Sequence, residues 1–107
     1  MWYIFPQIQG LGSSETSRRY AIASLDEAKA YLAHSVLGAR LLECTALVNA
    51  VAKRSAVEIF GSVDAMKFRS SMTLFHKASA GDGVFREALE KYFDGEADEL
   101  TLERLRP

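Results

Sequence analysis

The chain has 107 residues, enough for one domain with a single core, and its 49% apolar and 25% charged composition is that of an ordinary globular protein. A formal net charge of −1 at pH 7 argues against electrostatic capture of nucleic acid or of an anionic membrane surface. The single cysteine excludes an internal disulfide, and no apolar run reaches the roughly 18 residues of a membrane span, so we expect one cytoplasmic domain over 1–107.

The chain begins with an apolar arm, Trp2, Tyr3, Ile4 and Phe5, followed by Pro6. Aromatic and β-branched residues favour an extended backbone, and the proline keeps the residue before it out of the helical region. Burying each large apolar side chain is worth roughly 1.5–3 kcal/mol. The arm is therefore expected either to enter the core of its own chain or to dock on another chain.

Two helices are predicted in the next part of the chain. Ser24 and Glu27 form a capping box, which predicts the start of a short helix. Ser35 is expected to cap a longer helix from about 36 to 53. One side of this second helix carries a narrow apolar stripe made of Leu37, Leu41, Cys44, Val48 and Val51.

The second half of the chain predicts further helices. Ser55 and Glu58 form another capping box, for a short helix that Gly61 ends. The next helix begins at Ser62 or Asp64 and runs to about residue 80. Two more follow, at 84–93 and near 99–105. The fold class is therefore all-α, a small single-domain bundle of about four to six helices with an extended apolar N-terminal arm.

The richest polar stretch lies on the helix that begins near residue 62. Lys67 and Ser71 share one flank of its apolar stripe, but a Ser–Lys nucleophile needs a desolvated lysine and an oxyanion hole, and the sequence shows neither. Arg69, Thr73 and His76 share the other flank, where binding of a phosphate or carboxylate is the more plausible chemistry. We therefore predict no catalytic residue here.

Metal and cofactor sites are not predicted. His34, His76 and Cys44 lie too far apart to have the ligand spacing of a zinc site. Gly10 and Gly12 lack the third glycine and the βαβ setting of a dinucleotide fingerprint.

Five short motifs spread over nearly the whole chain carry a family resemblance. They are Trp2-x-x-Phe5-Pro6-Gln7, Leu11-Gly12-Ser13, Arg19-Tyr20-x-Ile22, Val36-Leu37-Gly38-x-Arg40-Leu41 and Lys67-Phe68-x-Ser70-Ser71-Met72-Thr73-Leu74-Phe75. Together they resemble a bacterial family catalogued as domain of unknown function number eighteen-ten. The resemblance implies a small, mainly helical protein with no established activity. Some members carry the label calpastatin, which nothing in this sequence supports.

The resemblance also points to polar positions where a pocket common to the family would lie: Gln7, Arg19, Tyr20, Asp64, Lys67, Ser70, Ser71 and Thr73. The chain departs from the family pattern at Ser35, where members commonly have proline. Members also usually carry a helical segment before the tryptophan motif, which here starts at Met1. Without that segment we expect uncovered apolar surface. The chain is then a truncated piece of a longer protein, a naturally shortened variant or an obligate oligomer.

Two functions remain open. The favoured one is a non-enzymatic binding or interaction protein that self-associates, with a dimer favoured, through Trp2, Tyr3, Ile4 and Phe5. The alternative is a protein or enzyme that binds a nucleotide or another phosphorylated metabolite. In that reading the anion ligands are Arg19, Lys67 and Arg69, and the hydrogen-bond donors are Ser70, Ser71 and Thr73.

Overall fold

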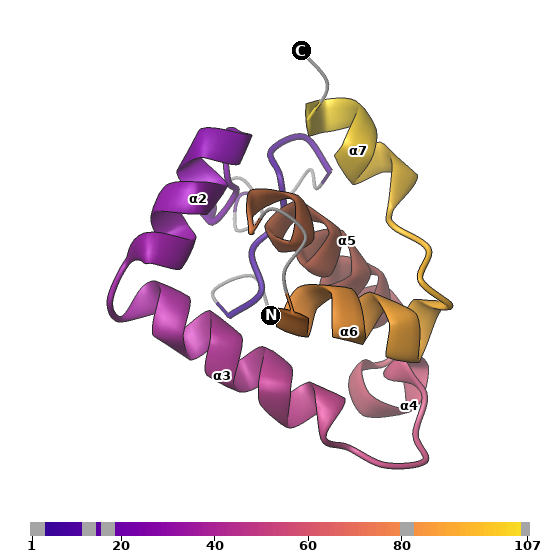
Figure 1. The fold of residues 1–107 in the computed structure, drawn as a ribbon. Helices are drawn as coiled ribbons and strands as arrows, with labels where there is room; N and C mark the ends of the chain where they lie inside the picture. Colours follow the sequence, from indigo (N-terminus) through magenta and orange to yellow (C-terminus); the bar gives the residue numbers. More distant parts are fainter. Residues whose placement is uncertain (1–3, 12–14, 16–18, 80–82, 106–107) are drawn as a thin grey trace.

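The computed structural model describes residues 4–11, 15, 19–79 and 83–105 (Figure 1). Within these ranges the chain forms six helices and no strand, so the predicted all-α fold is confirmed. The helices are α2 (Leu25–Ala33), α3 (Leu37–Asn49), α4 (Ala56–Phe60), α5 (Ser62–Ala78), α6 (Gly83–Phe93) and α7 (Glu99–Leu105). None of them is long and apolar enough to cross a membrane.

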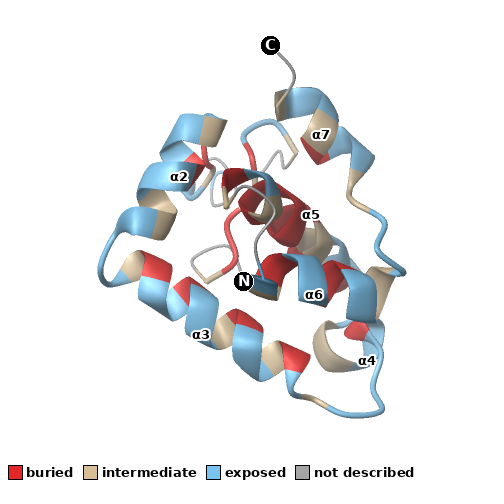
Figure 2. Cartoon of the chain, in the orientation of Figure 1, coloured by how far each residue is buried: buried red, intermediate tan, exposed pale blue. Residues whose placement is uncertain are grey.

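Helix α5 is the centre of the fold. It packs against α2, α4, α6 and α7, while α3 lies across α2 and α6 (Figure 1). Because neighbours cover it on several sides, its middle is buried almost all round, and Met72, Leu74 and Phe75 have no exposed surface (Figure 2). A helix with this environment loses the clear polar face that a surface helix shows.

An aromatic cluster joins the N-terminal arm to this centre. Phe68 of α5 is fully buried, and its ring centroid lies 5.0 Å from that of Phe5 and 4.9 Å from that of Phe60. Phe5 itself is only 5% exposed, and Ile4 packs half-buried against the same core. This part of the arm therefore enters the core of its own chain, while Trp2 and Tyr3 lie outside the described residues.

Backbone pairing fixes the segment that follows Phe5. Ile8 and Ile22 form an isolated parallel bridge, in which the Gln9 amide donates to the Ile22 carbonyl at 2.7 Å. The Ile22 amide in turn donates to the Gln7 carbonyl at 2.8 Å. Both isoleucines are buried, so the bridge also closes one side of the core.

The predicted capping box is confirmed at α4, where Ser55 Oγ accepts from the Glu58 amide at 3.1 Å and the Glu58 carboxylate accepts from the Ser55 amide at 2.8 Å. At α2 Ser24 Oγ accepts from the Glu27 amide at 3.1 Å, but the Glu27 carboxylate accepts from the Ala23 amide instead, so only half of the predicted box forms. The predicted cap of α3 is wrong: Ser35 makes no cap bond. Instead Nδ1 of His34 accepts from the amides of Val36 and Leu37, each at 3.1 Å. The imidazole thus supplies the acceptor that the first turn of α3 needs.

Helix α3 ends at Asn49, four residues before the predicted boundary. The carbonyl groups that would accept hydrogen bonds from another helical turn accept them from side chains of α6 instead. Lys91 Nζ donates to the carbonyls of Asn49 and Val51, and the Tyr92 hydroxyl donates to that of Val48. The end of α3 is therefore completed by a distant helix rather than by its own sequence.

Candidate functional site

The predicted polar residues of α5 have mostly internal partners. Lys67 Nζ lies 3.3 Å from Asp64 Oδ1, one turn away on the same helix. Ser70 Oγ donates to the Met66 carbonyl at 3.1 Å within the same helix, and Ser70 is only 5% exposed. The structure thus brings Asp64 and Lys67 together as an ion pair.

Ser71 is no accessible nucleophile. Its exposed fraction is 0%, and its Oγ has no hydrogen-bond partner among the residues that the structure describes. The hydroxyl is therefore not paired with Lys67, although the two side chains lie four residues apart. A Ser–Lys mechanism needs that pairing and an open path to the serine oxygen.

Arg69 and Thr73 hold the linker between α6 and α7. The Arg69 guanidinium donates to the carbonyls of Glu96 and Ala97 at 3.0 and 3.3 Å and lies 5.6 Å from the centroid of the Phe93 ring. Thr73 Oγ1 accepts from the Asp98 amide at 2.8 Å. Arg69 and Thr73 were predicted to bind an anion, but here they bind backbone groups of residues 96–98, an arrangement that we call the Arg69 clamp.

Replacing Arg69 with alanine is expected to lower the free energy of unfolding by about 2 kcal/mol, because two charge-assisted hydrogen bonds to backbone carbonyls are lost. Urea unfolding measures the change, and hydrogen exchange of residues 96–98 should become faster. The matched control is Arg86→Ala, whose ion pair with Glu90 is more than half exposed and should be worth under about 1 kcal/mol. Equal destabilisation by both variants would contradict the clamp.

The remaining predicted residues lie near the N-terminal segment. Gln7 is half-buried and supplies the carbonyl of the Ile22 bridge. Arg19 and Tyr20 are exposed, with the Arg19 guanidinium carbon 5.7 Å from the centroid of the Tyr20 ring. Neither of the two cavities described next is lined by any of the nine predicted ligand-binding residues.

A charged cleft lies one turn beyond Thr73, between the end of α5, α6, the linker that follows α6 and the middle of α7. Its volume is about 340 Å³, and we refer to it as the His76 cleft. The polar side chains that line it are His76, Lys77, Arg86 and Glu90, and the remaining lining residues are Leu89, Gly95, Ala97 and Leu102. Of the polar four, sequence analysis had singled out only His76.

The charges in the cleft are unequal. Arg86 Nε donates to Glu90 Oε1 at 3.0 Å, an i, i+4 pair whose side chains are 65% and 58% exposed. Lys77 makes no ion pair within the described ranges. Two cations therefore face one carboxylate, which leaves the cleft with a net positive charge.

The environment of His76 disfavours protonation of its imidazole. Partial burial, followed by the positive charges of Lys77 and Arg86, lowers the pKa of His76 below its ordinary value of 6.5, while Glu90 acts in the opposite direction. Its Nδ1 is buried and has no hydrogen-bond partner among the described residues. The surroundings thus disfavour the charged ring and leave its buried Nδ1 without a partner among the described residues.

This lowered pKa predicts a pH dependence of stability. The unfolded chain takes up the His76 proton near pH 6.5, whereas the folded chain takes it up only at lower pH. The free energy of unfolding should therefore decrease as the pH falls below 6.5, and His76→Gln should flatten that decrease. Urea titrations between about pH 5 and 8 measure both curves. Parallel curves for the two proteins would contradict the assignment.

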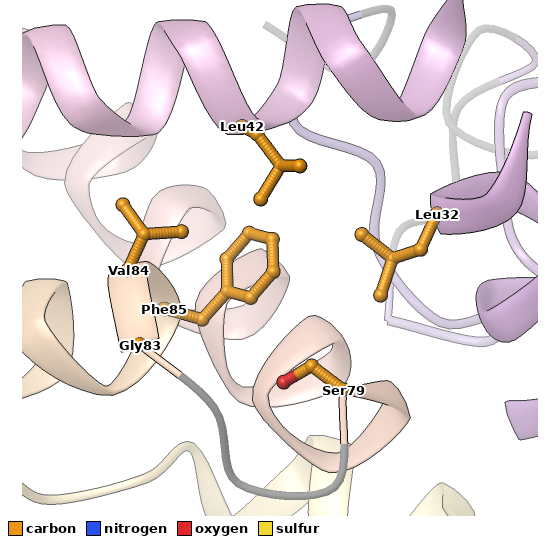
Figure 3. A pocket seen from close by; sticks show the side chains of 6 residues that line it. All are labelled: Leu32, Leu42, Ser79, Gly83, Val84 and Phe85. Atoms are coloured by element: carbon orange, nitrogen blue, oxygen red, sulfur yellow. The ribbon is translucent and has the colours of Figure 1, made fainter. Parts of the chain in front are cut away.

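A second cavity, of about 330 Å³, is apolar. Figure 3 shows Leu32 of α2, Leu42 of α3 and both Val84 and Phe85 of α6 pointing into it, with Ser79 at its edge. The Ser79 hydroxyl donates to the His76 carbonyl at 3.1 Å. The described residues that line this cavity include no charged side chain, so the His76 cleft is the better candidate for specific recognition.

The described part of the chain brings no three histidine, cysteine, aspartate or glutamate side chains together in an arrangement that would hold a metal ion. The two cations of the His76 cleft would repel a metal ion rather than bind it. The ligand to consider there is an anion.

Comparison with known proteins gives two matches. A family model described as "Protein of unknown function (DUF1810)" matches residues 1–105. The crystal structure of the conserved hypothetical protein Rv1873 from Mycobacterium tuberculosis is similar, with a TM-score of 0.95 and 52% sequence identity, and the alignment covers 97% of this chain and 74% of that one. No curated protein matches.

Proposed function

This chain belongs to the DUF1810 family of proteins of unknown function, as its motifs predicted, and we propose that it binds a small anionic molecule in the His76 cleft. The observation that carries the proposal is the meeting of Lys77, Arg86 and His76 in one cavity of about 340 Å³. That volume lies within the range of about 300–1,000 Å³ typical of small-molecule sites.

The proposed role is binding rather than catalysis. Ser71 is fully buried, and Lys67 is paired with Asp64, which leaves α5 without an activated nucleophile. The cleft itself supplies donors for charge-assisted hydrogen bonds, the interaction by which arginine and lysine hold phosphate and carboxylate groups. We therefore assign anion binding to Lys77 and Arg86 instead of Arg69, because the Arg69 guanidinium is hydrogen-bonded to carbonyls of its own chain.

The test is a thermal-shift and calorimetric titration with inorganic phosphate and acetate. A ligand present at 100 times its Kd should stabilise the fold by about 2.7 kcal/mol. The double substitution Lys77→Ala and Arg86→Ala should abolish the shift, whereas Lys29→Ala, an exposed lysine of α2, should retain it. No shift for the native chain with either anion, or an equal shift for the double variant, would reject the proposal.

Self-association is a second candidate, favoured by an exposed apolar pair at the start of α5. Val63 and Met66 lie three residues apart and are 64% and 70% exposed. Exposed apolar side chains that adjoin one another are typical of protein interfaces. They lie on the helix that carries Phe68, against which the N-terminal arm packs. Because Ile4 and Phe5 are packed in the core of their own chain, we propose a two-fold dimer formed through this exposed pair.

Light scattering coupled to size exclusion, over about a hundredfold range of concentration, tests the dimer. We expect twice the chain mass for the native protein and a monomer for Met66→Glu. Leu47→Glu, which changes an apolar side chain of α3 that is 63% exposed, should remain dimeric. A native chain that stays monomeric throughout would rule the dimer out.

A further inference from the structure

We infer that the molecule held in the His76 cleft is a phosphate ester that carries a free hydroxyl group, as a sugar or polyol phosphate does. This inference rests on the proposed function and adds the chemical class of the ligand. It starts from Glu90, which places a carboxylate in the same cleft as Lys77 and Arg86. That carboxylate weakens the attraction that the two cations exert on a ligand of purely negative charge.

The Arg86–Glu90 pair leaves complementary groups unused. Only Nε of Arg86 and Oε1 of Glu90 take part in their hydrogen bond within the described residues. A guanidinium has five N–H donors, so both terminal nitrogens of Arg86 remain for a phosphate, together with the Lys77 ammonium. The second carboxylate oxygen of Glu90 can only accept, so its matching partner on a ligand is a hydroxyl or an amine.

Two arguments select the hydroxyl. An ammonium group on the ligand would meet the same two cations that attract the phosphate, so a neutral donor fits the cleft better. His76 lines the cleft as well, and an imidazole ring can form a hydrogen bond with a ligand hydroxyl. The volume of about 340 Å³ is near the lower end for ligand sites, which fits a small polyol rather than a dinucleotide.

The experiment compares three probes by calorimetry: inorganic phosphate, ethyl phosphate and glycerol 3-phosphate. We expect glycerol 3-phosphate to bind the native chain about tenfold more tightly than ethyl phosphate, the effect of one hydrogen bond to a charged group. Glu90→Gln should reduce that preference while binding inorganic phosphate at least as well as the native chain, because a negative charge has been removed. Glu87→Gln, an exposed acid on α6 that does not line the cleft, is the matched control and should keep the preference.

The outcomes separate the two proposals. If neither inorganic phosphate nor either ester binds, the anion-binding function itself is rejected. If the esters bind with equal affinity, or if Glu90→Gln and Glu87→Gln have the same preference as the native chain, the hydroxyl inference fails while anion binding stands. Glu90 is largely exposed, so an unchanged melting temperature should show that the variant is folded.

Discussion

Replacing Gly38 with alanine is expected to destabilise the fold by about 3 kcal/mol, because the added methyl group has no space. A Cβ atom at this position would lie 2.0 Å from the Leu32 carbonyl oxygen and 2.7 Å from its carbonyl carbon. Both atoms belong to the backbone of α2, so no side-chain rotation relieves the contact. Intrinsic helix propensity alone predicts the opposite sign, since alanine is favoured over glycine by about 1 kcal/mol.

Urea unfolding followed by circular dichroism measures this change. Ala46→Ser is the matched control, since it enlarges a small side chain on the exposed side of the same helix and should cost about 0.5 kcal/mol. If the Gly38→Ala protein is as stable as the native chain, α2 and α3 can move apart at little cost in free energy. The close approach of Gly38 to the Leu32 carbonyl would then not be required for stability.

Replacing Phe68 with alanine is expected to lower the free energy of unfolding by about 4 kcal/mol. The ring is fully buried and contacts the rings of Phe5 and Phe60, so its removal leaves a cavity that rigid neighbours cannot fill. Phe5 also loses the aromatic partner whose ring centroid lies 5.0 Å from its own. We therefore expect faster hydrogen exchange at the amides of Gln9 and Ile22, which pair just after the arm.

Phe68→Leu is the graded comparison, because it keeps most of the apolar volume and should cost clearly less than alanine. The same two amides serve as the internal readout in both variants. If Phe68→Ala lowers global stability but leaves the exchange at Gln9 and Ile22 unchanged relative to the rest of the chain, the arm is held by other contacts.

Sequence analysis located most helices because their start and stop signals are local. Ser24 and Ser55 each cap through an amide three residues ahead, a spacing visible in the sequence. His34 was missed as a cap because its imidazole reaches α3 only after the chain has turned between two helices. Propensity and spacing do not describe that turn.

The site was harder to predict for a similar reason. Spacing on α5 placed Arg69 and His76 on one flank, but their partners come from elsewhere in the chain. The guanidinium of Arg69 donates to carbonyl groups 27 and 28 residues further along the chain. Helical spacing cannot predict a contact over that separation. Arg86 and Glu90 line the cleft with His76 because α6 packs against α5, a tertiary arrangement that the sequence alone leaves open.

The way α3 ends has a consequence for the order of events during synthesis. The acceptors at its last turn are satisfied by Lys91 and Tyr92, which follow them by 40 to 44 residues. During synthesis α3 therefore leaves the ribosome before Lys91 and Tyr92 do. Until α6 emerges, the last carbonyl groups of α3 are hydrogen-bonded only to water and this end of the helix frays. The α3–α6 contact should thus form late in folding, and a truncated nascent chain that lacks α6 should present this end of α3 to chaperones and proteases.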